Sequence, residues 1–173
     1  MLKIVLAPDP VLRIVCDPLV QVDSQHQKLI KEMFKTMYEA NGVGLAAPQV
    51  GINKRIFIID AGAREEIKNP IAMINPIITN IKKKTSIYEE GCLSFPSHYA
   101  ELERSDEITV EYLDEYNKKQ KLVTKDFTSR VIQHELDHIN GILFVDHLSR
   151  LKRDVIIRKM KKYKKELNKS DEK

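Results

Sequence analysis

Two histidines stand four residues apart in the segment QHELDH (residues 133–138), and a carboxylate directly follows the first of them. On a helix, residues i and i+4 lie about 40° apart around the axis and about 6 Å apart along it, so His134 and His138 can face one metal ion. Glu135 lies one step further round and can reach a water molecule on that ion without being a ligand. Two ligands and a base are the components of H-E-x-x-H hydrolases, so the segment predicts metal-assisted hydrolysis.

The alternative is a surface helix that carries two solvated histidines. The neighbours of the motif argue against it, because they are the apolar residues Val131, Ile132, Leu136 and Ile139. Histidines without partners would be costly in such a buried setting. The pattern therefore favours a metal site over a solvated face.

The residues alone leave the third metal ligand open. In one metalloprotease class a histidine follows six residues after the second one, but that position here is Phe144. Other histidines and glutamates lie in polar or basic surroundings: His26, His98, His147, Glu166 and Glu172. Cys16 and Cys92 are, taken singly, most simply small buried residues.

The bulk composition is that of an ordinary globular domain. The chain has 173 residues, 42% of them hydrophobic and 31% charged, and a net charge of +4 that gathers near the C-terminus. No run of eighteen apolar residues is present, and the N-terminal segment lacks the pattern of a secretory signal. With only two cysteines, we expect reduced thiols and a cytoplasmic protein, with neither membrane nor DNA as a partner.

The first half of the chain predicts one helix and several strands. Apolar residues repeat with a helical period over 24–41, where Asp23 or Ser24 can cap the start and Gly42 suits the stop. Residues 42–51 are too rich in glycine and proline for a helix and predict a shaped loop. Residues 55–60 predict a buried strand, and 72–80 and 84–90 predict further strands with a break at Pro76.

The second half predicts a hairpin and two helices. Residues 107–114 alternate cleanly and pair with 118–126. Thr128 or Ser129 caps a helix that runs to about Asn140, with Gly141 as its stop. A last amphipathic helix follows, with one apolar stripe of Leu148, Leu151, Val155, Ile156, Met160, Tyr163 and Leu167. This order of elements predicts an α+β domain over 1–167, and residues 168–173 predict a disordered tail.

Three segments together give a more specific indication: GVGLAAPQ (42–49), EGCLS (90–94) and QHELDH (133–138). Their order and separations resemble the three signature motifs of the peptide deformylases. That family removes the formyl group from the initiator methionine of newly made bacterial and organellar proteins. The resemblance covers the whole chain and implies a single catalytic domain, with mixed and antiparallel β-sheets packed around a central metal-binding helix.

By position, the resemblance makes Cys92, His134 and His138 the ligands of one divalent metal ion. The family often uses Fe²⁺ in the cell, and Zn²⁺, Ni²⁺ or Co²⁺ can replace it. Such a set is tetrahedral with one position open, as a hydrolytic metal requires.

The remaining roles follow in the same way. Glu135 becomes the general base and later the proton donor to the leaving amine. Gln49 and the backbone N–H of Leu93 become donors to the oxyanion that forms when the formyl carbon is attacked, and one such donor contributes roughly 3 kcal/mol. N-formylmethionyl nascent peptides are the implied substrates, with contacts from Gly44, Tyr88, Gly91, Phe127, Val131 and Arg104.

Two features qualify the resemblance. Some bacterial members carry an arginine seven residues after the metal cysteine, and this chain has Tyr99 there. In some relatives a C-terminal helix docks on the ribosome. The basic helix near the end of this chain is compatible with such a contact, but a solvated face is the more common explanation of such a run.

Two rival functions remain. An H-E-x-x-H metalloprotease lacks a credible downstream third ligand here. A non-enzymatic protein with a structural metal would fill all four positions with protein ligands, and no fourth ligand is evident.

Overall fold

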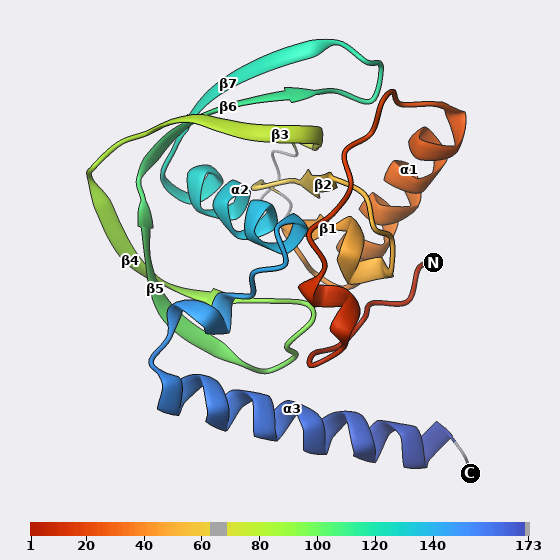
Figure 1. Cartoon of the computed structure of the whole chain (residues 1–173), viewed down its shortest axis with the longest axis vertical. Coiled ribbons are helices and arrows are strands. Elements are labelled where there is room, and N and C mark those ends of the chain that lie inside the picture. Colours follow the sequence, from red (N-terminus) through yellow and green to blue (C-terminus); the bar gives the residue numbers. More distant parts are fainter. Residues whose placement is uncertain (63–68, 172–173) are drawn as a thin grey trace.

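The computed structural model describes residues 1–62 and 69–171 and contains helices and short antiparallel strands (Figure 1). The helices are α1 (Ser24–Glu39), α2 (Asp126–Ile139) and α3 (Arg150–Asp171), and the short 3₁₀ helices are η1 (Pro10–Arg13), η2 (Ala47–Val50) and η3 (Phe144–His147). The strands are β1 (Gly44–Ala46), β2 (Ile56–Ile59), β3 (Ile71–Ile81), β4 (Thr85–Gly91), β5 (Tyr99–Ser105), β6 (Glu107–Leu113) and β7 (Lys119–Lys125).

The strands form two sheets around one helix. The larger sheet has the order β1-β2-β3-β6-β7, and β4 and β5 form a second sheet. Figure 1 shows α2 between the two sheets, with α1 at the β1–β2 end and α3 along the far side of β5. Every strand ladder in the described part of the chain is antiparallel, and parallel pairing is limited to an isolated bridge between Asp17 and Lys54. The predicted α+β class with a central helix is confirmed.

The predicted strand break at Pro76 is wrong. β3 runs through this residue to Ile81, and its pairing with β6 shifts register between Ile74 and Ile77. Asn75, at a φ of 50°, forms the bulge, so the missing N–H of Pro76 falls outside the regular ladder. The predicted hairpin of residues 107–114 with 118–126 is confirmed as β6 and β7.

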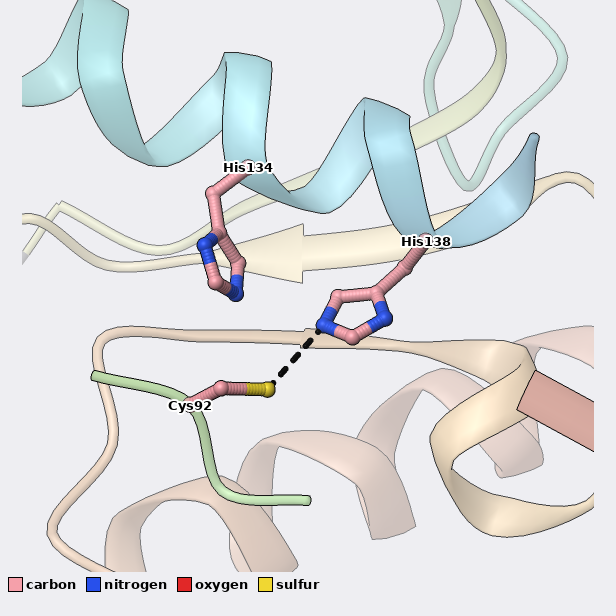
Figure 2. Close-up of side chains that lie close together, drawn as sticks. All are labelled: Cys92, His134 and His138. Carbon is pink, nitrogen blue, oxygen red and sulfur yellow. Dashed lines mark hydrogen bonds between the residues drawn. The ribbon is translucent and has the colours of Figure 1, made fainter. Parts of the chain in front are cut away.

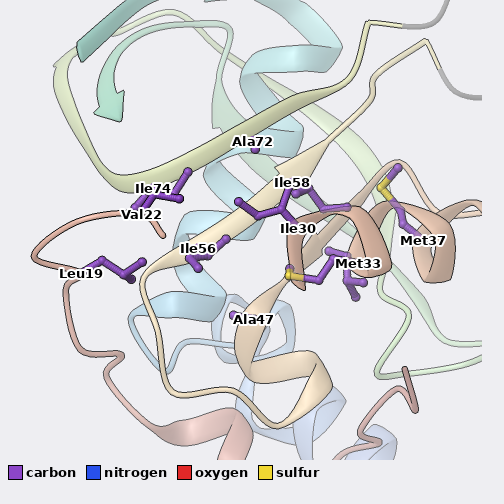
Figure 3. Close-up of a cluster of buried hydrophobic side chains, with 11 residues drawn as sticks. Leu19, Val22, Ile30, Met33, Met37, Ala47, Ile56, Ile58, Ala72 and Ile74 are labelled. Carbon is purple, nitrogen blue, oxygen red and sulfur yellow. The ribbon is translucent and has the colours of Figure 1, made fainter. Parts of the chain in front are cut away.

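Helix α1 supplies one side of the larger core (Figure 3). Asp23 caps it by accepting the backbone N–H groups of Gln25 and His26. The buried residues of this core come from α1, the strands and the loops beside them: Leu19, Val22, Ile30, Met33, Met37, Leu45, Ala47, Ile56, Ile58, Ala72 and Ile74. The predicted stop at Gly42 needs correction, because Asn41, at a φ of 54°, takes the left-handed position first.

The segment predicted as a shaped loop contains regular structure. Residues Gly44–Ala46 form the edge strand β1, and residues Ala47–Val50 form the 3₁₀ helix η2. Among the described strands β1 pairs only with β2, so its other edge is left for a partner outside the sheet. The three strand residues are all buried, a burial that the glycine and proline content did not reveal.

Helix α2 begins earlier than predicted. Its first residue is Asp126, and the Ser129 hydroxyl donates to the carbonyl of Ser105 instead of capping the helix. This bond fastens the first turn of α2 to β5. The predicted stop is confirmed, since Gly141 has a φ of 72° and a Cβ there would lie 2.5 Å from the carbonyl oxygen of Arg13.

Helix α3 is amphipathic, but its buried face differs from the predicted stripe. Met160 is fully buried in a separate hydrophobic cluster with Phe95 and Phe144. In contrast, Leu151 is 76% exposed, and Val155 and Tyr163 are each 40% exposed. The helix continues to Asp171, so residues 168–171 of the predicted tail are helical, and 172–173 lie outside the described residues. Over the described part of the chain, no helix combines the length and apolarity that a membrane span needs.

Candidate active site

Three side chains from distant parts of the sequence meet beside α2. His134 and His138 lie on α2, and Cys92 lies in the loop that follows β4 (Figure 2). One ligand atom from each residue lies within 4.8 Å of the other two, and the Cys92 Sγ atom is 3.2 Å from Nε2 of His138. The two histidines project from the same face of the helix toward the cysteine, as their spacing predicts.

The residue before Cys92 is a glycine that lies against an aromatic ring. Gly91 ends β4 opposite Tyr99 of β5, and a Cβ at Gly91 would lie 2.6 Å from the ring of Tyr99. The chain then turns back, with the N–H of Phe95 donating to the carbonyl of Cys92. The turn leaves the Cys92 thiol facing α2.

Glu90 holds the first histidine in place. Its Oε2 atom is 3.1 Å from Nδ1 of His134, while Arg104 Nε and Arg130 Nη1 donate to its Oε1 atom. Burial alone would raise the pKa of Glu90, but its hydrogen bonds with His134 and Arg104 hold that pKa well below its usual range. An anionic carboxylate at Nδ1 leaves Nε2 of His134 as the free ligand atom.

The donor set fits a divalent metal ion. A thiol sulfur and two imidazole nitrogens form the Cys/His/His pattern of three-ligand hydrolytic sites. Burial, together with the nearby charge of Arg104, lowers the pKa of His138 well below its usual value, so this ring stays neutral. Neutral imidazole is the form that binds metal.

Glu135 lies buried beside these ligands. It is 4% exposed, and its Oε2 atom has no hydrogen-bond partner among the described residues. Burial raises the pKa of Glu135 to about 7. The carboxyl group lies against β1, since a Cβ at Gly44 would come within 2.3 Å of Glu135 Oε1. A glycine at position 44 is therefore needed for this carboxyl group to lie where it does.

The amide of Gln49 has a fixed orientation. Its Oε1 atom accepts the backbone N–H of Ala46 at 2.9 Å, so the opposite NH₂ group points to the site. That group is 3.2 Å from Ser94 Oγ and 3.5 Å from Cys92 Sγ. Gln49 is 1% exposed, so this donor is held in a largely water-free setting.

A cavity of about 490 Å³ opens onto these groups. Among the residues that line it are Gly44, Gln49, Gly91, Cys92, Leu93, Tyr99, Phe127, Arg130, Val131, His134 and Glu135. The lining therefore includes four of the six residues predicted to contact substrate, Gly44, Gly91, Phe127 and Val131.

The other two residues predicted to contact substrate lie outside the cavity lining. Tyr88 is 61% exposed and its ring packs on the guanidinium of Arg130, 5.0 Å from the ring centre. Arg104 is buried behind the ligands, with its donors on Glu90 and Asp137. Neither residue is part of the cavity lining.

Sequence reasoning missed the charged groups behind the ligands. Arg104 links Glu90 to Asp137, and Arg130 donates to Glu90. Asp137 also accepts a hydrogen bond at 2.8 Å from His147. His147 was predicted to be a surface residue, and it is 42% exposed in its side chain. A signal was available at Glu90 and Asp137, since both lie within the quoted motifs, but nothing in the sequence indicated that Arg130 would be buried.

Comparisons with known proteins agree with this geometry. Residues 1–154 match the family model described as polypeptide deformylase. A peptide deformylase of Rhizobium meliloti (strain 1021) is 45% identical over 159 residues, which cover 92% of this chain and 91% of that protein.

Solved structures give the same result. The crystal structure of peptide deformylase from Ehrlichia chaffeensis has a TM-score of 0.91 and 36% identity, covering 95% of this chain and 97% of that one. A peptide deformylase from Legionella pneumophila has a TM-score of 0.89 and 40% identity, covering 97% and 98%. With both the sequence and the fold matched over nearly its full length, the chain belongs to the peptide deformylase family.

Proposed function

We propose that this chain hydrolyses the N-formyl amide of formylmethionyl nascent peptides and releases formate, using Cys92, His134 and His138 as metal ligands. One observation carries the assignment: these three residues converge beside a cavity whose lining includes Cys92, His134 and the buried Glu135. The membership of the chain in the deformylase family supports the same reaction.

The metal would lie between Cys92 Sγ and the ring nitrogens of the two histidines. When bound, a divalent ion supplies Lewis acidity toward the formyl oxygen and lowers the pKa of a nearby water molecule. We propose Fe²⁺ as the ion in the cell and a cytoplasmic location. The ligand set supports Fe²⁺ without requiring it, because Zn²⁺, Ni²⁺ and Co²⁺ suit the same donors, and reduced thiols fit a reducing compartment.

Glu135 is the proposed proton carrier. Its buried Oε2 atom, which has no partner among the described residues, takes a proton from the attacking water and later gives it to the leaving nitrogen. A pKa raised by burial to about 7 supports both directions of transfer near neutral pH. Because the Cβ position of Gly44 lies against this carboxyl group, β1 and α2 together set where the proton is exchanged.

Two groups are the proposed donors to the developing oxyanion. The Nε2 group of Gln49 is fixed by the bond of its Oε1 atom to Ala46. The backbone N–H of Leu93 makes no hydrogen bond with another described residue, so it is available to a ligand in the cavity. Donors that are oriented before the reaction stabilise the transition state without a reorganisation cost, each by roughly 3 kcal/mol.

The substrate backbone would pair with the free edge of β1, next to Gly44. Extended peptides bind such edges through main-chain hydrogen bonds. The methionine side chain would then contact Phe127 and Val131, the apolar residues that α2 contributes to the cavity. Ribosome contact through α3 is a further proposal, supported by the exposed lysines along that helix.

The decisive experiment measures formate release from a formyl-Met-Ala-Ser peptide by the metal-loaded protein. We expect formate from the formylated peptide and no cleavage of the same peptide without the formyl group. Cleavage between residues of the unformylated peptide would favour the metalloprotease alternative. Tight metal binding with no hydrolysis of either peptide would favour a structural metal site.

A further inference from the structure

An arginine on the metal-binding helix is not explained by the proposed reaction. Arg130 lies one helical turn before His134 and is 5% exposed. Its guanidinium donates to the carbonyl of Ser86 at 2.7 Å, to the carbonyl of Leu102 at 3.0 Å and to Glu90 Oε1 at 2.8 Å. One side chain therefore joins α2 to both β4 and β5.

The carboxylate of Glu90 is shared between Arg130 and His134. Arg130 holds the Oε1 atom, while the Oε2 atom faces Nδ1 of His134 at 3.1 Å. Arg104 binds across both oxygens, through Nε to Oε1 at 2.7 Å and through Nη2 to Oε2 at 3.0 Å. Arg104 alone could let the carboxylate tilt between its two donors. Arg130 removes that freedom, because it approaches Oε1 from the same helix that carries His134.

We propose that Arg130 is a positioning residue for His134: by holding Oε1 of Glu90 it aims Oε2 at Nδ1, and so orients the ring nitrogen that faces the metal site. The inference rests on the proposed role of His134 as a ligand. Groups that orient a metal-binding histidine commonly change metal affinity by about 10–100-fold when removed. The planar fork of an arginine suits three acceptors at once, whereas a lysine offers only a point charge.

The test compares Arg130→Met and Arg130→Lys with the wild type. Zn²⁺ affinity is measured by competition with a chelator, and the Co²⁺ absorption spectrum reports the ligand geometry. We expect Arg130→Met to weaken Zn²⁺ binding by about 10-fold or more and to alter the Co²⁺ bands, with Arg130→Lys between it and the wild type. Arg158→Met, an exposed arginine on α3, is the matched control and should leave both measurements unchanged.

A double-mutant cycle with Glu90→Gln separates positioning from a general loss of stability. If Arg130 acts through Glu90, adding Arg130→Met to Glu90→Gln should weaken Zn²⁺ binding much less than Arg130→Met does alone. Fully multiplicative losses, or a Zn²⁺ affinity of Arg130→Met within about twofold of the wild type, would overturn the proposal. If Arg130→Met does not fold, Arg130→Lys decides: wild-type Zn²⁺ affinity and Co²⁺ bands would reject the proposal.

Metal affinity and formate release are separate readouts. A wild-type protein that binds Zn²⁺ but releases no formate would contradict the proposed function and leave the positioning role of Arg130 standing. If the wild-type protein releases formate but substitution of Arg130 leaves the Zn²⁺ affinity unchanged, the positioning role of Arg130 would be contradicted and the proposed function would stand.

Discussion

Helices α2 and α3 are both amphipathic by sequence, yet the structure treats their charged residues in opposite ways. On α2, charged or titratable residues such as Arg130, Glu135 and His138 are buried between two sheets. On α3, Met160 is buried while most charged residues remain exposed. A buried charge needs a partner, whereas an exposed charge is stabilised by water. Substitutions around α2 should therefore affect the site strongly, and those on α3 only weakly.

The largest effect is expected when the sulfur ligand beside α2 is removed. Cys92→Ser should lose most of its bound metal, because a hydroxyl stays protonated and binds a divalent ion poorly. Cys16→Ser is the matched control, since Cys16 is also buried but lies in another core cluster. It should cost roughly 1 kcal/mol of unfolding free energy and keep the metal. Metal content and formate release are measured side by side, and metal loss from Cys16→Ser alone would show that the third ligand is misassigned.

Glu135→Gln should keep the metal but lower kcat by about 10²- to 10⁴-fold. The amide has nearly the same shape, yet it cannot take a proton from water. The measurement is single-turnover formate release at confirmed metal occupancy. Near-normal turnover by this variant would mean that another group carries the proton.

Gly44→Ala tests the contact between β1 and α2. The added Cβ would lie 2.3 Å from Glu135 Oε1, so the carboxyl group or the strand must move. A displacement of about 1 Å at a catalytic group can cost about 10²-fold in rate, and we expect a loss of kcat/KM of that order with metal affinity unchanged. Gly51→Ala is the control for a glycine substitution, because a Cβ there meets no atom within 4 Å. The φ of 80° at this position means that Gly51→Ala should lower the stability of the fold but leave the activity of the folded protein unchanged. Equal activity in Gly44→Ala and the wild type would refute the close packing.

The smallest effect is expected at the end of α3. Deleting residues 162–173 removes the ion pair of Lys164 with Asp9, whose side chains are 36% and 34% exposed, and such pairs contribute about 0–1 kcal/mol. Met160 stays in place, so peptide deformylation should be nearly unchanged. If α3 contacts ribosomal RNA, only the full-length chain should bind ribosomes, and salt should weaken that binding steeply. A large loss of deformylase activity on truncation would remove the contrast between the two helices.

The sequence determined those features of the site that depend on one element. The i, i+4 spacing places His134 and His138 on one helix face wherever that helix lies, and the alternating pattern of 107–114 is sufficient to predict β6 and its hairpin. Local conformation also explains Gly141 as the stop of α2. These predictions hold because neighbours along the chain stay neighbours in space.

Only the tertiary structure decided which distant residues meet and which face of each strand turns inward. Cys92 reaches the histidines because the β4–β5 sheet packs on α2, and a separation of 46 residues between Cys92 and His138 does not reveal that contact. Arg104 looked available to substrate, but the register of β5 against β4 turns it toward α2, where Glu90 and Asp137 bind its guanidinium. A shift of one residue in the pairing register of a strand moves every side chain to the opposite face of the sheet. Because β5 has little alternation of apolar residues, its sequence does not fix that register. Pairing with β4 and the ion pairs of Arg104 decide which side chains turn inward.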